Sequence, residues 1–272
     1  MTWYRHPLCR IGAAIILAFV LAGVAAGHLT RYDPNWQDLS AQLAAPSASH
    51  WFGTDSLGRD IYSRVLYGAR DSIPVSFAVV ALAVALGLLL GAPAGYFGGA
   101  VDEVLMRVTD LFLAFPSLIL AMAIAGALGP SLPHVLLALS ISWWPSYARL
   151  VRSQVMGWRD APFVDAVRCM GASPARILVR HVLPNCIAPV VVQATLDLGG
   201  VILTAAGLSF IGLGAQPPEP EWGSMVNAGR LYIASQWWVA TFPGLAILLT
   251  GFGFNLFGDG LRDALDPRRA GR

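Results

Sequence analysis

Arginine side chains gather in one polar stretch of an otherwise apolar sequence, residues 149–185, which reads RLVRSQVMGWRDAPFVDAVRCMGASPARILVRHVLPN. The stretch contains six arginines and no lysine, and apolar segments flank it on both sides. Guanidinium groups pair with carboxylates in a fixed geometry, so Arg168, Arg176 and Arg180 are suited to orienting a protein partner. The chemistry that these residues predict is the docking of a partner, on the side of the membrane where positive charge accumulates.

Proline, glycine and serine divide the second half of this stretch into two helices. Pro162 is suited to the first turn of a helix over FVDAVRCM, and Gly171 to a left-handed cap at its end. Ser173 and Pro174 are suited to the N-cap and first turn of a second helix, ARILVRHVL, which Pro184 is expected to stop. The order predicts a helix–turn–helix projection. The small residues that let a partner surface approach it are Ala166, Gly171 and Ala172.

Asp197 is the acidic residue that lies most clearly inside an apolar segment, about ten residues beyond Ile187. A carboxylate within a membrane span is costly and is by default a functional candidate. Two interpretations stay open. Asp197 lines a translocation path that favours a cationic substrate, or its role is structural, with a hydrogen bond to a neighbouring helix or a shallower position in the membrane.

Motifs for catalysis and for cofactor binding are absent from the sequence. Neither GxxxxGK[ST] nor GxGxxG occurs, so any ATP is expected to be bound by another chain. His134 and His181 have no second ligand at metal-binding spacing, and the three cysteines match no metal pattern, so we predict no metal, no cofactor and no disulfide in this chain. An intramembrane enzyme would also need a nucleophile with a base inside the spans, and none is visible.

The composition predicts an all-α polytopic membrane protein. Hydrophobic residues make up 56% of the chain and charged residues 12%, against about 25% charged in soluble domains. A helix needs about 20 apolar residues to cross a hydrocarbon core about 30 Å thick. The six runs that meet this length are residues 11–29, 73–96, 105–128, 132–147, 187–213 and 237–257.

The arginines also orient these six transmembrane helices. If residues 149–185 are cytoplasmic, both termini are cytoplasmic too, with thirteen arginines inside and five outside, which is the expected bias. Arg5 and Arg10 precede the first run as they would in a signal peptide, but the run is too long, so we interpret it as a retained helix. The formal net charge of +2 says little about acidic partners, because the placement of the charges reflects this topology. We expect no nucleic-acid partner.

Two polar segments are expected outside the membrane. In HWFGTDSLGRDIYSRVLYGARDS, apolar residues at helical spacing predict an amphipathic interfacial helix with Asp55, Arg59 and Arg64 on its polar face. The PPEPEW run cannot be regular helix, because proline lacks the amide donor. It predicts an ordered loop with Trp222, Trp237 and Trp238 at the outer interface.

The segment DAVRCMGASPARILVRHVLPN resembles the EAA loop of the membrane subunits of binding-protein-dependent ABC importers, whose coupling helix inserts into a cleft on an ATPase subunit. The family pattern is EAA, three residues, Gly, nine residues, an aliphatic position, one residue, then LP. Asp for Glu and Val for the second Ala are mild departures, and His181 at the aliphatic position is a variation associated with the peptide and nickel branch. The residues that the resemblance assigns to the ATPase-coupling loop are Asp165, Ala166, Val167, Gly171, Ala172, Ser173, Pro174, Leu183 and Pro184.

Four further blocks resemble the second permease subunit of that branch, the dipeptide and oligopeptide permease C type: HWFGTDSLGRDIYSRVLYGAR, LSFIGLG, PPEPEWG and FNLFGDGLRDALDPR. The resemblance covers nearly the whole chain and implies the type I ABC importer permease fold in the bacterial inner (plasma) membrane. It also implies a second homologous permease subunit, two ATP-binding subunits that hydrolyse the ATP, and a periplasmic or extracellular solute-binding protein.

The resemblance divides the chain into three parts: residues 1–71 with the first span and the external amphipathic segment, residues 72–263 with the importer domain and its coupling loop at 149–185, and a cytoplasmic tail at 264–272. It implies half of a translocation pathway for dipeptides or oligopeptides, with nickel or a nickel chelate open as the alternative substrate. An ion-coupled secondary transporter is the alternative from another class, but the chain has one intramembrane charge and no evident repeat between its halves.

Overall fold

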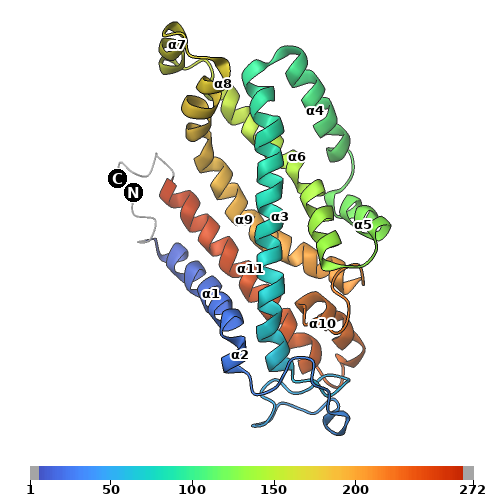
Figure 1. Ribbon diagram of the computed structural model, residues 1–272. Coiled ribbons are helices and arrows are strands. Elements are labelled where there is room, and N and C mark those ends of the chain that lie inside the picture. The colour runs from blue at the N-terminus through green and yellow to red at the C-terminus, as the bar shows by residue number, and fades with distance from the viewer. Residues whose placement is uncertain (1–5, 266–272) are drawn as a thin grey trace.

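The computed structural model describes residues 6–265, and within this range the chain is a bundle of helices without β-strands (Figure 1). The α-helices are α1 (Pro7–Val24), α2 (Ala26–Leu29), α3 (Ile61–Phe97), α4 (Gly99–Leu113), α5 (Ser117–Leu128), α6 (Leu132–Trp158), α7 (Pro162–Cys169), α8 (Pro174–Ile177), α9 (Leu183–Phe210), α10 (Trp222–Gly229) and α11 (Trp238–Leu265). The shorter elements are the 3-10 helices η2 (Leu39–Ala41) and η4 (Arg230–Tyr232) and the π-helix η3 (Leu178–Val182).

Four helical stretches of the described chain are long and apolar enough to cross a membrane: α1, α3, the run from α8 to the end of α9, and α11. The pair α4 and α5 makes a fifth if it is counted as one span. α6 has 27 residues but is less apolar than the others. Each of the six predicted spans therefore coincides with helix, and four or five of them meet the length and composition needed for spanning.

The third predicted span, residues 105–128, differs most from expectation. α4 ends at Leu113, α5 begins at Ser117, and the two helices are bent by 82° at this break. Pro116 lies in the break, and proline disfavours the helical conformation at the residue before it, here Phe115. A straight helix over this range is therefore wrong, and a bent pair takes its place.

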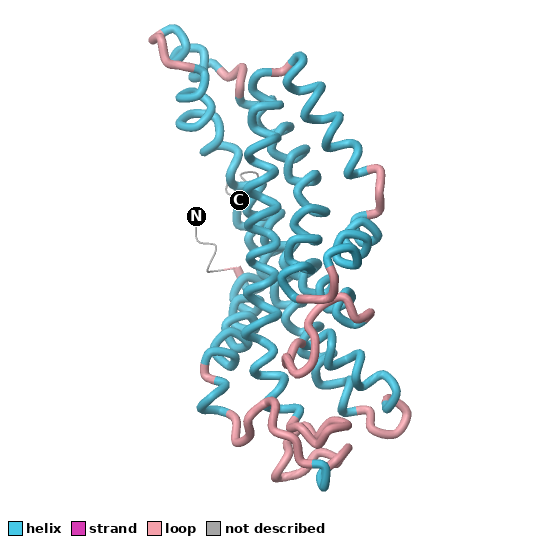
Figure 2. Tube along the Cα trace, turned by 45° about the vertical axis from the view of Figure 1, so that its right-hand side comes forward, coloured by secondary structure: helices cyan, strands magenta, loops and turns pink. Residues whose placement is uncertain are grey.

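α3 and α6 pack against each other along much of their lengths (Figures 1 and 2). Gly87, Gly91 and Gly95 recur at every fourth residue of α3 and face α6. A Cβ atom at Gly87 would overlap the side chain of Tyr147, and one at Gly91 would overlap the backbone of Ala148. Because glycine at this spacing lets two membrane helices approach closely, the pair forms one rigid unit.

The bundle has two distinct ends. α7 and α8 project from one end, whereas α2, α10 and the loop of residues 30–60 cover the other (Figure 1); Figure 2 shows the same two ends from another side. We name them the α7 end and the α10 end. The first and last long helices lie side by side, since His6 Nε2 is 3.5 Å from Asp263 Oδ2 and the thiol of Cys9 donates to the carbonyl oxygen of Phe257. This adjacency fits two termini on one side of the membrane, while the sidedness itself stays a prediction.

Two predictions concern segments near the chain ends and the start of α3. Arg5 and residues 266–272 of the predicted tail lie outside the described residues, and residues 264–265 belong to α11.

The prediction of a separate amphipathic interfacial helix before the second span is wrong. Residues 55–60 form a turn, and helix begins only at Ile61, from which α3 continues unbroken across the predicted boundary at 71 and 72.

Candidate functional site

α7 is a two-turn helix at the tip of the α7 end. Asp165 lies in its first turn and Arg168 in its last, an order that suits the helix dipole. Arg168 Nη1 donates to Asp165 Oδ1 at 2.7 Å, and both side chains are about half exposed. Val164 is the one residue of α7 that is buried. Val164, together with the partly buried Val167, therefore anchors a helix whose charged side chains are exposed.

The turn after α7 has the backbone conformation that the sequence predicted. Gly171 has a φ of +81°, and its amide donates to the carbonyl of Arg168 at 3.0 Å. The amide of Ala172 donates to the carbonyl of Val167 at 3.4 Å, which completes a Schellman motif. No atom lies within 4 Å of the position that a Cβ would take at Gly171. Backbone conformation, and not lack of space, is what requires glycine here.

The return from the turn confirms one sequence prediction and overturns another. Ser173 is the N-cap of α8 in extended conformation and Pro174 follows in the first turn, although the Ser173 side chain makes no capping hydrogen bond. Pro184 does not stop the helix, because α8, η3 and α9 run on to Phe210. In η3 the hydrogen-bond register widens to five residues. A π-turn of this kind accommodates the missing amide and the ring of a proline that would break a regular α-helix.

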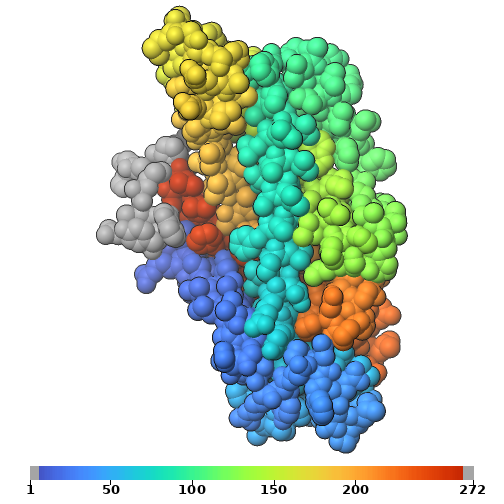
Figure 3. Space-filling model, in the orientation of Figure 1, coloured from blue at the N-terminus to red at the C-terminus, as the bar shows by residue number. Residues whose placement is uncertain are grey.

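The tip of the α7 end presents a mixed surface of apolar, small and charged groups, visible as the outermost projection in Figure 3. Met170 is 77% exposed, and Phe163 is exposed as well. Of the residues predicted to form the coupling loop, Val167, Ala172 and Leu183 are partly buried against the core. The exposed members are Asp165, Ala166, Gly171, Ser173, Pro174 and Pro184.

The six arginines of residues 149–185 do not all lie on one loop. α6 extends to Trp158, so Arg149 and Arg152 belong to this helix and tie it to α4. The ion pairs formed by the six are Arg149–Asp110, Arg152–Asp102, Arg159–Asp160 and Arg168–Asp165. Arg176 and Arg180 are exposed and form no ion pair with any residue that the structure describes. These two arginines remain available to a partner.

A second polar feature lies midway along α9. Asp197 Oδ2 accepts a hydrogen bond from the Tyr147 hydroxyl of α6 at 2.6 Å, and Oδ1 accepts one from Gln193 Nε2 at 2.9 Å. Tyr147 is buried, whereas Asp197 is partly exposed. The interhelical hydrogen bond is the contact that one of the two sequence interpretations expected. A role in the translocation path stays a prediction.

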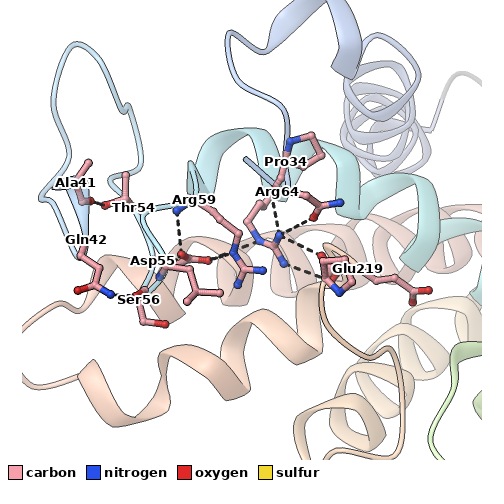
Figure 4. A network of polar contacts seen from close by, with 12 residues as sticks. Pro34, Ala41, Gln42, Thr54, Asp55, Ser56, Arg59, Arg64 and Glu219 are labelled. Atoms are coloured by element: carbon pink, nitrogen blue, oxygen red, sulfur yellow. Dashed lines mark hydrogen bonds and ion pairs between the residues drawn. The ribbon is translucent and has the colours of Figure 1, made fainter. Parts of the chain in front are cut away.

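The α10 end holds charged side chains that the sequence led us to expect on an exposed polar face. That expectation is wrong: Asp55, Arg59 and Arg64 are 3–7% exposed. Arg59 Nε donates to Asp55 Oδ2 at 2.7 Å (Figure 4). Arg64 donates to the carbonyl oxygens of Pro34 and Pro218, and Asp55 accepts from the amides of Leu57 and Arg59, so these buried groups bond to protein atoms. Gly53 and Gly58, on either side of residues 54–57, have positive φ. These two glycines were the feature of the sequence that could have predicted a tight turn here.

Arg64 joins three parts of the chain that are distant in sequence (Figure 4). Its Nη1 donates to the carbonyl oxygen of Pro34 at 2.9 Å and to that of Pro218 at 3.3 Å. It also donates to Asn35 Oδ1 at 3.2 Å, and its Nη2 donates to the carbonyl oxygen of Glu219 at 3.3 Å. One guanidinium group thus holds the loop of residues 30–60 and the loop before α10 onto the start of α3.

The loop before α10 is fixed by Glu221 and Trp222. The two carboxylate oxygens of Glu221 accept the amides of Gly223 and Ser224 at 2.9 and 2.8 Å, and burial raises the pKa of this carboxyl. Trp222 is fully buried, and its indole N–H donates to the carbonyl of Val65 at 2.9 Å. Its predicted place at the outer interface is therefore wrong. Trp238 is buried too, and Trp237 is 51% exposed.

Residues 6–265 contain no group of three or more His, Cys, Asp or Glu side chains that could hold a metal ion. His134 lies at the start of α6, where its Nδ1 is 2.7 Å from the carbonyl oxygen of Gly129, and His181 lies on η3.

Residues 83–271 match the family model of binding-protein-dependent transport system inner membrane components. The probable D,D-dipeptide transport system permease protein DdpC of Escherichia coli strain K12 is 50% identical over 266 residues, which cover 98% of this chain and 89% of the relative. The dipeptide transport system permease protein DppC of Alkalihalophilus pseudofirmus is 47% identical, with coverages of 97% and 87%. The glutathione transport system permease protein GsiD of Escherichia coli O6:K15:H31 is 43% identical, with coverages of 98% and 88%.

Two solved structures share the fold. Both are inward-facing conformations of the MetNI methionine ABC transporter, in native and selenomethionine-soak crystal forms. The first has a TM-score of 0.54 at 20% identity and covers 73% of this chain and 96% of the other. The second has a TM-score of 0.56 at 19% identity and covers 75% and 96%.

Proposed function

Because this chain belongs to the family of binding-protein-dependent transport system inner membrane components, we propose that it is the permease of an ATP-driven importer of short peptides, in which α7 docks on a separate ATP-hydrolysing subunit. The relatives named above, aligned over 87–89% of their lengths, are permeases for dipeptides, D,D-dipeptides or glutathione, which is itself a short peptide. Neither nickel import nor ion-coupled transport is favoured by these relatives.

The observation that carries the docking role is the connection of the α7 tip to the bundle. α6 leads into α7 after a break of three residues, and the run from α8 to α9 leads out of it. α7 itself is anchored by the buried Val164 and the partly buried Val167, and it exposes the charged pair Asp165–Arg168, with the exposed Met170 directly after it. A displacement imposed on α7 therefore acts on two long helices of the bundle at once.

The remaining parts of the importer are assigned by the same proposal. ATP is bound and hydrolysed by two partner subunits at the α7 end, which is then the cytoplasmic end. A second, homologous permease forms the other half of the pathway, and a solute-binding protein delivers the peptide at the α10 end. The partly exposed face of α9 near Asp197 lies on the pathway.

The direct test is reconstitution in liposomes of the chain with its second permease, both ATP-binding subunits and the solute-binding protein. Uptake of radiolabelled Ala-Ala should require ATP on the side of the ATP-binding subunits and should stop when either those subunits or the binding protein are left out. Uptake of Ala-Ala by the chain alone, without any ATPase, would overturn the proposal.

Substitution at Gly171 tests the docking role of the α7 tip. Valine strongly disfavours a φ of +81°, whereas asparagine tolerates this region. We expect Gly171→Val to lower Ala-Ala uptake per ATP hydrolysed by about tenfold and Gly171→Asn to retain most of it, since about 1–2 kcal/mol of strain distorts the turn in the first variant alone. Equal coupling ratios in the two variants would contradict a role for this turn.

A further inference from the structure

The negative charge of Asp197 has no compensating positive charge beside it. Tyr147 and Gln193 supply hydrogen bonds from neutral donors, which orient the carboxylate but leave its charge in place. No arginine or histidine nitrogen of residues 6–265 lies within 4 Å of it. An ionised carboxylate in apolar surroundings is unfavourable until it meets a cation.

An open groove between α6, α9 and α11 begins one helical turn from this carboxylate. Gln193, which holds Asp197, lines the groove together with Leu150 of α6, Leu196 of α9 and Arg262 of α11. Its volume is about 410 Å³, against about 30 Å³ for a water molecule in the liquid, so a small solute can enter. Arg262 makes no ion pair among the described residues. The groove and its edge therefore offer one charge of each sign, as a zwitterionic peptide requires.

The hydrogen-bonding capacity of Asp197 identifies the class of cation. A carboxylate has about four acceptor positions, of which Tyr147 and Gln193 use two, and a primary ammonium group brings three donors. Hard metal ions such as Ca²⁺ take about six to eight oxygen ligands, far more than one carboxylate, one phenol and one amide supply. A primary ammonium group fits the vacant positions best.

The support of Asp197 links this carboxylate to the α7 tip. Tyr147 is held in a fixed place on α6, because the absent side chain of Gly87 leaves room for it. Asp197 lies on α9, and α6 and α9 are the two helices that flank α7 and α8 in the chain. A shift of α6 along α9 therefore changes the Tyr147–Asp197 hydrogen bond and, with it, the number of acceptor positions open to a ligand.

We propose that Asp197 binds the amino-terminal ammonium group of the peptide during its passage through the membrane, with Tyr147 as the residue that positions the carboxylate. The proposal rests on the peptide-import function given above. It assigns to this chain a selectivity for a free amino terminus, in addition to any selectivity of the solute-binding protein.

The first experiment separates charge from hydrogen bonding in the complete importer. Asp197→Asn keeps an oxygen that accepts from Tyr147, whereas Asp197→Ala removes both functions and Asp197→Glu restores the charge. We expect Asn and Ala to lower ATP-driven Ala-Ala uptake at least tenfold and Glu to recover much of it, with complex assembly unchanged in Asn. Wild-type uptake in Asp197→Asn beside impaired uptake in Asp197→Ala would show a structural role and overturn the proposal.

The second experiment measures binding without transport, so that it stands apart from the import function. Dicyclohexylcarbodiimide labelling of Asp197 in the purified complex is followed by mass spectrometry. Millimolar Ala-Ala should slow labelling severalfold, while N-acetyl-Ala-Ala, which lacks the ammonium group, should not. Equal protection by the two peptides, or none by either, would overturn the proposal. ATP-independent Ala-Ala uptake in the wild type would instead reject the import function and leave this binding result standing.

Discussion

The two ends of the bundle each contain an Asp–Arg pair with the same N–O distance, 2.7 Å, in opposite surroundings. Asp55–Arg59 at the α10 end is almost fully buried, and Asp165–Arg168 at the α7 tip is about half exposed. Breaking a buried pair leaves a charge without water or partner and costs about 3–5 kcal/mol, whereas an exposed pair contributes about 0–1 kcal/mol. Distance alone is therefore a poor guide to role. The buried charges of the α10 end stabilise the fold. The exposed charges of the α7 tip are accessible to a partner.

The largest expected effect is at Arg64, and it tests the α10 side of this comparison. Arg64→Leu removes the donor to four oxygen atoms of the loops at the α10 end, so we expect destabilisation by about 3–5 kcal/mol in thermal unfolding of the purified chain in detergent. The control is Arg107→Leu, which removes the well-exposed pair with Glu103 and should change stability by less than about 1 kcal/mol. Similar losses in the two variants would remove the distinction between the ends.

The next effect concerns the α3–α6 contact that connects the ends. Gly87→Ala places a methyl group where Tyr147 already lies, and we expect a loss of about 1–3 kcal/mol because neither backbone can withdraw. Gly126→Ala in α5 is the matched control, since no atom lies within 4 Å of the new Cβ. Helix propensity should make the control neutral or stabilising by up to about 1 kcal/mol. A Gly87→Ala variant as stable as the control would refute close packing as the basis of the rigid unit.

A smaller effect is expected from the pH dependence of the α10 end. Burial, with a contribution from Asp71, raises the pKa of Glu221 above its ordinary value of 4.5. The folded chain therefore holds this proton more tightly than the unfolded chain. The resulting stabilisation is complete below pH 4.5 and is lost as the pH rises through the elevated pKa, by about 1.4 kcal/mol for each unit of elevation. Between pH 4.5 and 8, thermal unfolding of the wild type should thus lose stability relative to Glu221→Gln. Parallel curves for the two proteins would contradict the elevated pKa.

The smallest effect on stability is expected at the α7 tip. Asp165→Ala removes an exposed carboxylate and should change the free energy of unfolding by less than about 1 kcal/mol. Its effect on ATP-driven Ala-Ala uptake should nevertheless be severalfold if, as proposed, the same group contacts the ATP-binding subunit. Asp160→Ala, which removes another exposed carboxylate just before α7, should leave uptake near the wild-type rate. If both variants transport like the wild type, the tip charges have no part in docking.

Local signals in the sequence were sufficient for the α7 tip. The left-handed turn at Gly171 and the proline in the first turn of α8 depend on neighbouring residues alone, and both were predicted. Pro116 carried an equally local signal for the bend between α4 and α5, which the count of apolar residues obscured. At Pro184 the local signal was misleading. Proline usually ends a helix, but here a π-turn precedes it and the helix continues.

The α10 end and the surroundings of Asp197 depend on contacts that no local pattern contains. Arg64 bonds to a residue 154 positions away, and Tyr147 bonds to Asp197 across 50 positions. The spacing of charges at residues 55–64 is that of an exposed amphipathic face, and only the covering loops bury it. The sequence likewise left two interpretations of Asp197 open, because identifying its donor required knowing which helices are neighbours.

The glycine contacts between α3 and α6 have a mechanical consequence. With 27 residues, α6 is a lever arm about 40 Å long, so a rotation of about 5° about its α7 end moves its far end by about 3.5 Å. The close contacts at Gly87, Gly91 and Gly95 make α3 share that rotation, and the first turn of α3 contains Arg64, to which both loops of the α10 end are bound. A few degrees of tilt at one face of the membrane thereby become an ångström-scale displacement at the other.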